Sequence, residues 1–179
     1  MTSNSPRDFS TETDEPPRQF SVFDIDGVLA DVRHRLHYVQ RAPKDWDGFF
    51  AHMDRDLALE EGLAMVLLRV SQGDEIVYLT GRNEGYREVT AVWLAAQGLP
   101  TGRLIMRRDS DRRPARFFKP EALERLSQQG TINIVVDDDD AVVTALRAKN
   151  WPVFHATWMP SDKDEQQSLF NAQEVDGRN

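Results

Sequence analysis

The segment Phe20-Ser21-Val22-Phe23-Asp24-Ile25-Asp26-Gly27 is the part of the sequence that says most about the fold. Its apolar beginning predicts a short strand, which ends in two carboxylates and a glycine. Asp24 and Asp26 are one residue apart, so their side chains point the same way and share a pocket. Carboxylates this close repel each other unless a cation lies between them or one of them holds a proton. Gly27 lets the backbone turn sharply, so this strand end is a candidate for charged chemistry.

Further along the chain, short apolar runs alternate with longer stretches of helical periodicity. The apolar runs predict strands at 75–79, 104–106, 132–136 and 152–155. The periodic stretches predict helices at 59–72, 85–97, 120–128 and 141–149, and the first helix carries an apolar face of Leu63, Val66, Leu67 and Val70. This alternation predicts an α/β, Rossmann-like fold with a central parallel sheet of about five strands and helices on both faces. In such folds the ligand lies beyond the carboxyl ends of the strands.

The composition suits one compact domain with flexible ends. The chain has 179 residues, of which 40% are hydrophobic. Residues 1–19 predict a disordered N-terminal tail, 20–160 the folded domain and 161–179 a flexible acidic tail. The chain has no cysteine, which excludes disulfides, thiolate metal sites and cysteine nucleophiles. No apolar run is long enough to cross a bilayer and the N-terminus is polar, so we expect a cytoplasmic protein that does not bind membranes.

The charge is unevenly distributed. The net charge of −8 argues against a generally basic nucleic-acid binder. Between residues 103 and 119, however, seven basic residues face two acidic ones, a local charge of +5 that leaves −13 for the rest of the chain. The basic residues are Arg103, Arg107, Arg108, Arg112, Arg113, Arg116 and Lys119. A concentrated basic segment in an acidic protein suggests that an anion is received there, and a solvated arginine-rich loop is the alternative.

Polar residues also follow two other predicted strands. Thr80-Gly81-Arg82 offers a hydroxyl, an amide and a guanidinium that can all donate to phosphate oxygens, although a helix cap with a turn glycine would look the same. Four aspartates, 137–140, follow the strand at 132–136. Asp139 and Asp140 are expected in the first turn of the next helix, where acidic residues are favoured. Asp137 and Asp138 lie closest to the sheet and are therefore the better metal-ligand candidates.

The ordered set of Asp-x-Asp-Gly, Thr-Gly-Arg, a lysine and an Asp-Asp pair resembles the four motifs of the haloacid dehalogenase (HAD) superfamily. The lysine is Lys119, and the resemblance covers the whole folded unit. A narrower likeness, to the phosphatase domain of bacteriophage polynucleotide kinase/3′-phosphatase, is carried by residues 80–82 with 86–94, 106–108, Asp111, Arg113, Lys119, 137–138 and 142–143. That family removes 3′-phosphates from nucleic-acid ends and nucleotides. The chain contains no Gly-x-x-x-x-Gly-Lys-Ser/Thr loop, so it resembles the phosphatase half alone.

The resemblance implies a magnesium-dependent phosphatase that forms an aspartyl-phosphate. Asp24 would attack phosphorus, and Asp26 would protonate the leaving oxygen and then activate water. Thr80, Lys119 and the Gly81 amide would stabilise the transferring group, and the candidates for substrate contacts are Gly81, Arg82, Arg107, Arg108 and Arg113. The expected Mg²⁺ ligands are the side chains of Asp24 and Asp138, with Asp137 in support and the backbone carbonyl of Asp26. Dehalogenases lack the second acid, so Asp26 argues against dehalogenation.

Superfamily members insert a cap after the first motif, and here the segment 30–57 is a short one. A small cap leaves the mouth of the pocket open, which suits a large or extended substrate. Its Trp46, Phe49 and Phe50 are expected to form a helical stripe packed on the core. His34 and His37 have no evident third metal ligand, so we expect surface residues or phosphate contacts.

The expected partner is a phosphorylated substrate, such as a nucleic-acid 3′ end or a nucleotide, and no protein partner is predicted. Two other functions remain open at the level of sequence. One is a phosphatase for small metabolites or free nucleotides, in which the arginine cluster grips a second phosphate. The other is a phosphate-binding regulatory module that keeps the fold without chemistry.

Overall fold

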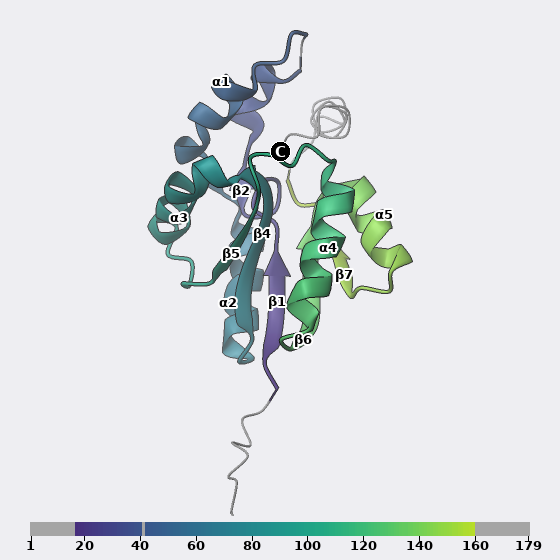
Figure 1. Cartoon of the computed structure of the whole chain (residues 1–179). Helices are drawn as coiled ribbons and strands as arrows, with labels where there is room; N and C mark the ends of the chain where they lie inside the picture. Colours follow the sequence, from purple (N-terminus) through teal and green to yellow (C-terminus); the bar gives the residue numbers. More distant parts are fainter. Residues whose placement is uncertain (1–16, 41, 160–179) are drawn as a thin grey trace, which may run out of the picture.

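The computed structural model describes residues 17–40 and 42–159. Five parallel strands form the central sheet in the order β5-β4-β1-β6-β7, and they are β1 (Gln19–Phe23), β4 (Glu75–Asn83), β5 (Arg103–Arg107), β6 (Thr131–Asp137) and β7 (Val153–His155). Helices α2 (Glu60–Ser71) and α3 (Arg87–Ala96) cover one face, and α4 (Ala115–Ser127) and α5 (Asp140–Ala148) cover the other (Figure 1). The predicted α/β class with helices on both faces is confirmed. The predicted tails lie outside the described residues, apart from 17–19.

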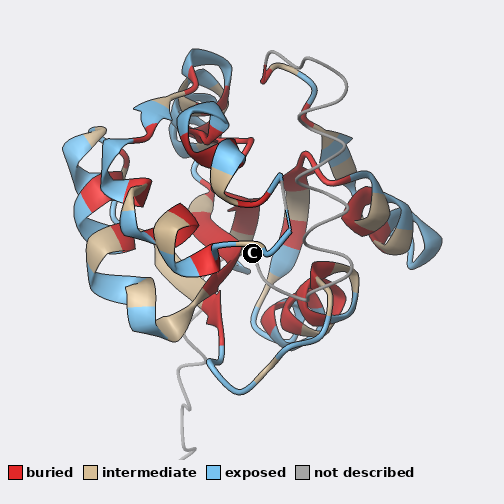
Figure 2. Cartoon of the chain, turned by 90° about the horizontal axis from the view of Figure 1, so that it is seen from above, coloured by how far each residue is buried: buried red, intermediate tan, exposed pale blue. Residues whose placement is uncertain are grey.

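The core forms on both sides of β1 because successive side chains of a strand point to opposite faces. Phe20 and Val22 pack with α4 and α5, whereas Phe23 packs with α2 and α3. All three residues are fully buried. Seen from above, buried residues line the sides of the helices that face the sheet, and exposed residues line their outer sides (Figure 2). The strand that carries the first motif therefore lies at the centre of the molecule.

Strand β4 is longer than predicted and includes the Thr80-Gly81-Arg82 motif. Its pairing with β5 shifts register between Leu79 and Asn83. The motif is therefore held as extended backbone inside the sheet instead of in a loop beyond it. This placement buries Thr80 and Arg82 at the carboxyl edge.

Helix α4 begins earlier than predicted, at Ala115 instead of Pro120. Proline favours the first helical position because its missing N–H costs nothing there. Here Pro114 is the N-cap and Pro120 lies inside the helix, where it forgoes one backbone hydrogen bond. The earlier start places Lys119 on the helix, where packing holds its side chain.

Helix α2 buries only part of the predicted face. Val66 is buried and Leu63 packs against the core, but Leu67 and Val70 are 58% and 41% exposed. The helix instead approaches the loop after β1 through Gly62, where an added Cβ would lie 2.0 Å from the Val28 carbonyl oxygen. This close approach turns the Gly62–Val66 side toward the sheet.

We therefore expect Gly62→Ala to lower the free energy of unfolding by about 1–3 kcal/mol, because the new methyl group overpacks the contact with Val28. Alanine ordinarily stabilises a helix relative to glycine by roughly 0.5–1 kcal/mol, so the sign of the change is informative. Urea denaturation measures it. Gly85→Ala is the control, since its nearest atom would be 3.7 Å away. A stability gain in Gly62→Ala would contradict the close approach.

The segment predicted as a cap lies between two short strands, β2 (Ala30–Asp31) and β3 (Leu57–Ala58), which pair antiparallel. Between them are η1 (Arg33–Tyr38), α1 (Trp46–Ala51) and η2 (Met53–Arg55). In Figure 1 this insertion lies above the end of the sheet to which the β1 arrow points. The predicted packing of the α1 aromatic stripe is confirmed, because Trp46, Phe49 and Phe50 are buried in one cluster.

Candidate active site

Four of the predicted site residues meet at the carboxyl edge of the sheet. Asp24 follows β1, Asp137 ends β6, Asp138 comes next, and Lys119 reaches in from α4. The Lys119 Nζ lies 2.7 Å from Asp24 Oδ2 and 2.7 Å from Asp137 Oδ2. Carboxylate oxygens of Asp24, Asp137 and Asp138 lie within 4.8 Å of one another. All four side chains are buried, so the structure brings together three acids and one cation in a confined space.

Gly27 is required for this approach. Its φ is +79°, a conformation that favours glycine, and an added Cβ would lie 1.9 Å from Asp138 Oδ2. The glycine of the first motif therefore makes room for an acid of the last motif. Asp139 takes the place predicted for it, as the N-cap of α5, where its Oδ1 accepts from the backbone N–H groups of Ala141 and Val142.

The site contains more acidic than basic groups: three carboxyl groups surround one lysine. Burial raises the pKa of Asp24 to about 7; Lys119 opposes this shift and Asp137 adds to it. Burial also raises the pKa of Asp138 well above its usual value, and the charges of Asp24 and Asp137 raise it further. Burial lowers the pKa of Lys119, but Asp137 and Asp24 raise it by more, so this side chain stays protonated. The single positive charge of Lys119 therefore does not balance the three carboxylates, and a further cation would stabilise their ionised forms.

A magnesium ion fits this site. Asp24 Oδ1 is buried and has no hydrogen-bond partner among the described residues. It belongs to the group of carboxylates whose oxygens lie close enough to share one ion. Mg²⁺ prefers oxygen ligands of this kind. The donor set thus matches the cofactor that the sequence predicts.

A second charged cluster, which we call the arginine–aspartate cluster, consists of Asp26, Arg35, Asp56 and Arg82. The Arg35 guanidinium donates to Asp26 Oδ1 at 2.6 Å and to both oxygens of Asp56 at 2.7 and 2.6 Å. Arg82 donates to Asp26 at 2.6 and 3.1 Å and to Asp56 at 3.1 Å. Both arginine side chains are fully buried. The cluster joins the cap, through Arg35 and Asp56, to the sheet.

These arginines set the protonation of Asp26. Burial pushes the pKa of its carboxyl up, but the nearby Arg82 and Arg35 push it down by more, so the pKa lies well below its usual value. Asp26 is therefore ionised in the free chain. This is the form of a carboxylate that can accept a proton.

Comparison with known protein families identifies the family of this chain. Residues 18–158 match the family described as the polynucleotide kinase PNKP phosphatase domain. The chain belongs to the PNKP phosphatase domain family. It is accordingly a phosphatase domain of the HAD superfamily. No curated protein matches the chain.

Solved structures agree with this assignment. A chain in the structure of a Pnkp1/Rnl/Hen1 complex is 25% identical, with a TM-score of 0.66, and the match covers 78% of this chain and 45% of that one. The PNKP-family chain described here thus spans less than half the length of that relative. A class C acid phosphatase from Bacillus anthracis with tungstate bound shares the fold, with 16% identity and a TM-score of 0.59, and the match covers 88% of this chain and 80% of that one.

Within the described residues, no helix is long and apolar enough to cross a membrane.

Three other predicted site residues of this PNKP-family chain, Thr80, Arg107 and Arg108, differ in their burial and contacts. Thr80 is buried and its hydroxyl accepts from the Arg82 backbone N–H at 3.2 Å. Arg107 is also buried, and its guanidinium donates to the carbonyl oxygens of Gly81 and Arg113. Arg107 thereby ties the loop after β5 to β4. Arg108 is exposed on that loop.

Arg113 is held by acidic neighbours. Its guanidinium contacts Asp111 at 2.8 Å and Glu121 at 2.6 Å. Its side chain is 49% exposed, so these pairs are screened by water. The structure therefore pairs Arg113 with carboxylates outside the cluster of Asp24, Asp137 and Asp138.

Arg35 and Asp56 are the residues of the arginine–aspartate cluster for which the sequence predicted no role. Both lie in the cap segment, where charged residues are frequent and only the fold shows which ones are buried. The one local signal is that Arg35 stands beside the buried apolar Leu36. His34 extends the cluster outward, with its Nε2 2.9 Å from Asp56 Oδ1.

Proposed function

We propose that the chain is a magnesium-dependent phosphomonoesterase that removes 3′-phosphates from nucleic-acid ends through an aspartyl-phosphate on Asp24. The observation that carries this proposal is the buried Asp24 Oδ1, which has no hydrogen-bond partner in the described part of the chain and lies beside Lys119 and the two other acids. The family supports the choice of substrate, and so does the similar chain from the Pnkp1/Rnl/Hen1 RNA repair complex. Because the match covers only 45% of that chain, we propose the substrate for the phosphatase portion alone.

The reaction requires one anion to attack another. Asp24, Asp137, Asp138 and the Asp26 carbonyl would hold Mg²⁺, which when bound would supply the charge that lets a carboxylate approach a phosphate. A carboxylate oxygen of Asp24 forms a bond to phosphorus while the bond to the leaving oxygen breaks. The Lys119 ammonium, beside the same carboxylate, and the Thr80 hydroxyl stabilise the negative charge of the transferring group.

Asp26 moves the protons. It takes up a proton from water as the substrate binds and gives this proton to the leaving oxygen, which departs as the 3′-hydroxyl of the nucleic acid. It then takes a proton from the water that attacks phosphorus, which releases inorganic phosphate and restores Asp24. When the substrate phosphate accepts hydrogen bonds from Arg35 or Arg82, these arginines stabilise the ionised Asp26 carboxylate less strongly. The pKa of Asp26 then rises toward the value that a general acid needs.

The substrate assignment is tested by phosphate release from a panel, with Mg²⁺ and with EDTA. The panel contains p-nitrophenyl phosphate, 3′- and 5′-nucleotides, and DNA and RNA oligomers phosphorylated at either end. We expect Mg²⁺-dependent release, fastest from 3′-phosphorylated oligomers. Release confined to small esters would contradict the substrate and favour a metabolic phosphatase. Release from no member would point to a phosphate-binding regulatory module.

Metal binding can be tested without turnover. We expect Mg²⁺ at about 100 times its dissociation constant to stabilise the wild-type chain by roughly 2.7 kcal/mol, since the ion binds the folded state alone. Asp138→Asn removes a ligand and should abolish the rise in Tm, measured by thermal denaturation. Asp140→Asn, at an exposed position in the same run of aspartates, is the matched control and should keep the rise. An equal rise in all three proteins would rule out this ligand set.

A further inference from the structure

The last strand of the sheet ends beside the candidate metal ligands. His155 is the final residue of β7, and in the strand register it lies opposite Asp137 of β6. The backbone N–H of the next residue, Ala156, donates to the Asp137 carbonyl oxygen at 2.9 Å. The two strands are therefore still paired at the point where Asp137 ends β6 and the chain continues to Asp138. Strand β7 thus brings His155 to the segment that carries two of the three acids.

The His155 ring contacts the backbone of Asp138. Its Nε2 lies 3.2 Å from the Asp138 carbonyl oxygen. A carbonyl oxygen can only accept, so Nε2 is the donor, and both the neutral tautomer with a proton on Nε2 and the imidazolium can donate there. The Asp140 carboxylate lies 3.6 Å from the same nitrogen, but its side chain is 80% exposed, so water screens this pair. The Asp138 carbonyl is therefore the partner that orients the ring.

The peptide group between Asp138 and Asp139 is held at both of its polar ends. Its N–H, which belongs to Asp139, donates to Asp137 Oδ1 at 3.2 Å. Its carbonyl, which belongs to Asp138, accepts from His155. A peptide group is planar, so fixing both ends fixes its orientation and that of the backbone from which the Asp138 side chain extends. His155 supplies one of these two hydrogen bonds.

The Asp138 carboxyl group needs such support because its neighbours repel it. An oxygen of this group lies close to oxygens of Asp24 and Asp137, and like charges at this distance repel each other. Gly27 leaves just enough room for the group, since an added Cβ at this glycine would lie 1.9 Å from Asp138 Oδ2. A carboxylate held against repulsion in a confined space depends on a fixed backbone.

We propose that His155 is a positioning residue for magnesium: by holding the Asp138 carbonyl, it keeps the Asp138 carboxylate in place as a metal ligand. This inference rests on the proposed magnesium site and adds a residue outside the three acids. Loss of a hydrogen bond that orients a metal ligand typically lowers metal affinity by about 10–100-fold. Mg²⁺ requires a near-ideal octahedral set of ligands, whereas Ca²⁺ accepts irregular ones. A misplaced carboxylate should therefore weaken Mg²⁺ binding more than Ca²⁺ binding.

The test measures how much Mg²⁺ each variant needs for a given rise in Tm. Stabilisation by a bound ion depends on the ratio of its concentration to its dissociation constant, so the metal-free proteins need not share one Tm. His155→Ala loses the donor and should need about tenfold more Mg²⁺ than the wild type. Its requirement for Ca²⁺ should rise by a smaller factor. His155→Gln keeps an N–H donor of similar reach and should need as much Mg²⁺ as the wild type.

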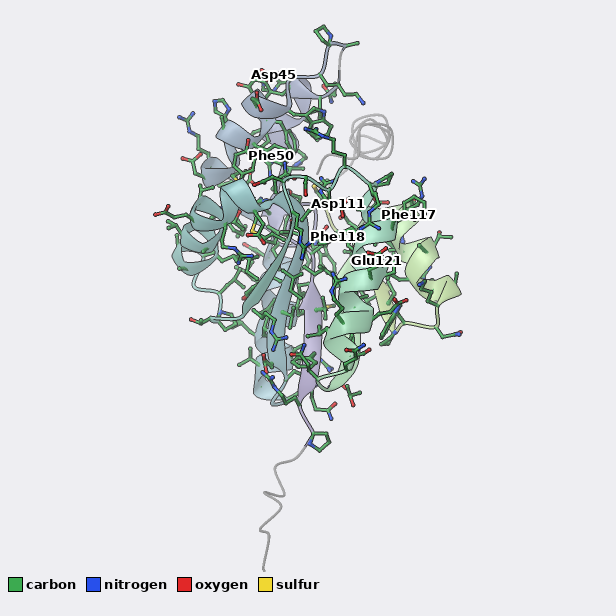
Figure 3. All side chains as sticks on the ribbon, in the orientation of Figure 1. Asp45, Phe50, Asp111, Phe117, Phe118 and Glu121 are labelled. Carbon is green, nitrogen blue, oxygen red and sulfur yellow. The ribbon has the colours of Figure 1, made fainter. Side chains whose placement is uncertain are left out.

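His52→Ala is the matched control. The His52 Nδ1 lies 2.8 Å from the Gly48 carbonyl oxygen, so this variant also loses a hydrogen bond between a histidine and a backbone carbonyl. His52 is the C-cap of α1. Figure 3 shows Asp45 and Phe50, near the two ends of this helix, in the cap above the sheet, whereas β7 belongs to the sheet below (Figure 1). His52→Ala should therefore need as much Mg²⁺ as the wild type, whatever its effect on the Tm without metal.

Three results would overturn the role of His155. The first is Mg²⁺ binding by His155→Ala that is as tight as that of the wild type. The second is a failure of His155→Gln to restore binding. The third is an equal loss of Mg²⁺ and Ca²⁺ affinity in His155→Ala, which would show that the substitution disrupts the whole site instead of misplacing one ligand.

These titrations use no substrate, so they separate this inference from the proposed function. A wild-type chain that binds Mg²⁺ but releases no phosphate from 3′ ends would refute the proposed substrate, and the titrations would still decide the role of His155. A wild-type chain that releases this phosphate without being stabilised by Mg²⁺ would refute the magnesium site and the role of His155 together.

Discussion

Asp24→Asn is expected to lower phosphate release by about 10³-fold or more, because the substitution removes the oxygen that attacks phosphorus. The amide has nearly the same shape, so circular dichroism should show an unchanged fold. Asp140→Asn makes the same chemical change in an exposed residue near the site and should keep most of the activity. Substantial phosphate release by Asp24→Asn would disprove the assignment of the nucleophile.

The same variant should alter how stability depends on pH when no metal is bound. Burial raises the pKa of Asp24 from 3.8 to about 7 in the folded chain. A carboxyl group with a raised pKa contributes stability below its unfolded pKa, and that contribution is lost as the pH rises through the folded pKa. The Tm of wild type and Asp24→Asn should therefore agree near pH 4. The variant should become increasingly more stable than wild type as the pH rises from about 4 to about 7, and the difference should level off above that pH. Parallel curves would show that Asp24 does not titrate in this range.

Arg82→Met is expected to cost about 3–5 kcal/mol of stability, because it leaves buried carboxylates without one of their cations. For a chain of this size that corresponds to a fall in Tm of about 6–20 °C. The carboxylates are those of Asp26 and Asp56, both of which keep Arg35 alone as a buried partner among the described residues. Thermal denaturation followed by circular dichroism measures the loss.

Two further variants make this prediction specific to charge. Arg87→Met breaks an exposed pair with Glu84, which should cost about 1 kcal/mol or less. Adding Asp26→Asn to Arg82→Met should restore part of the lost stability, because it removes an uncompensated charge. If Arg82→Met cost no more than Arg87→Met, the arginine–aspartate cluster would not hold the fold as described.

The features predictable from the sequence were those with a local signal. The strand at Phe20–Phe23 and the aspartates after it were predictable because an apolar run ends abruptly in charge. The N-cap role of Asp139 follows from its position before a helix. The predicted start of α4 at Pro120 was wrong. Proline prefers the first helical position, but here the tertiary packing around Lys119 outweighs that local preference and the helix begins at Ala115.

What could not be predicted depends on contacts between distant residues. The prediction for α2 was wrong for Leu67 and Val70, because Gly62 meets a carbonyl more than thirty residues earlier in the chain, at Val28. Arg35 and Asp56 are 21 residues apart and meet Arg82 only after the cap has folded onto the sheet. Asp56 has no local signal that separates it from an exposed charged residue of the same cap, and Arg35 has only the neighbouring apolar Leu36.

The arginine–aspartate cluster also bears on how such a protein can diversify. Arg35 and Asp56 lie in the inserted segment, whereas Asp26 and Arg82 lie in the sheet domain around it. An insertion from another protein that lacked an equivalent of Arg35 would remove one of the two cations that pair with Asp26. An insertion that lacked an equivalent of Asp56 would remove one of the two anions that pair with Arg82. We therefore expect recombination between relatives to yield working proteins only when the insertion brings its own matching pair.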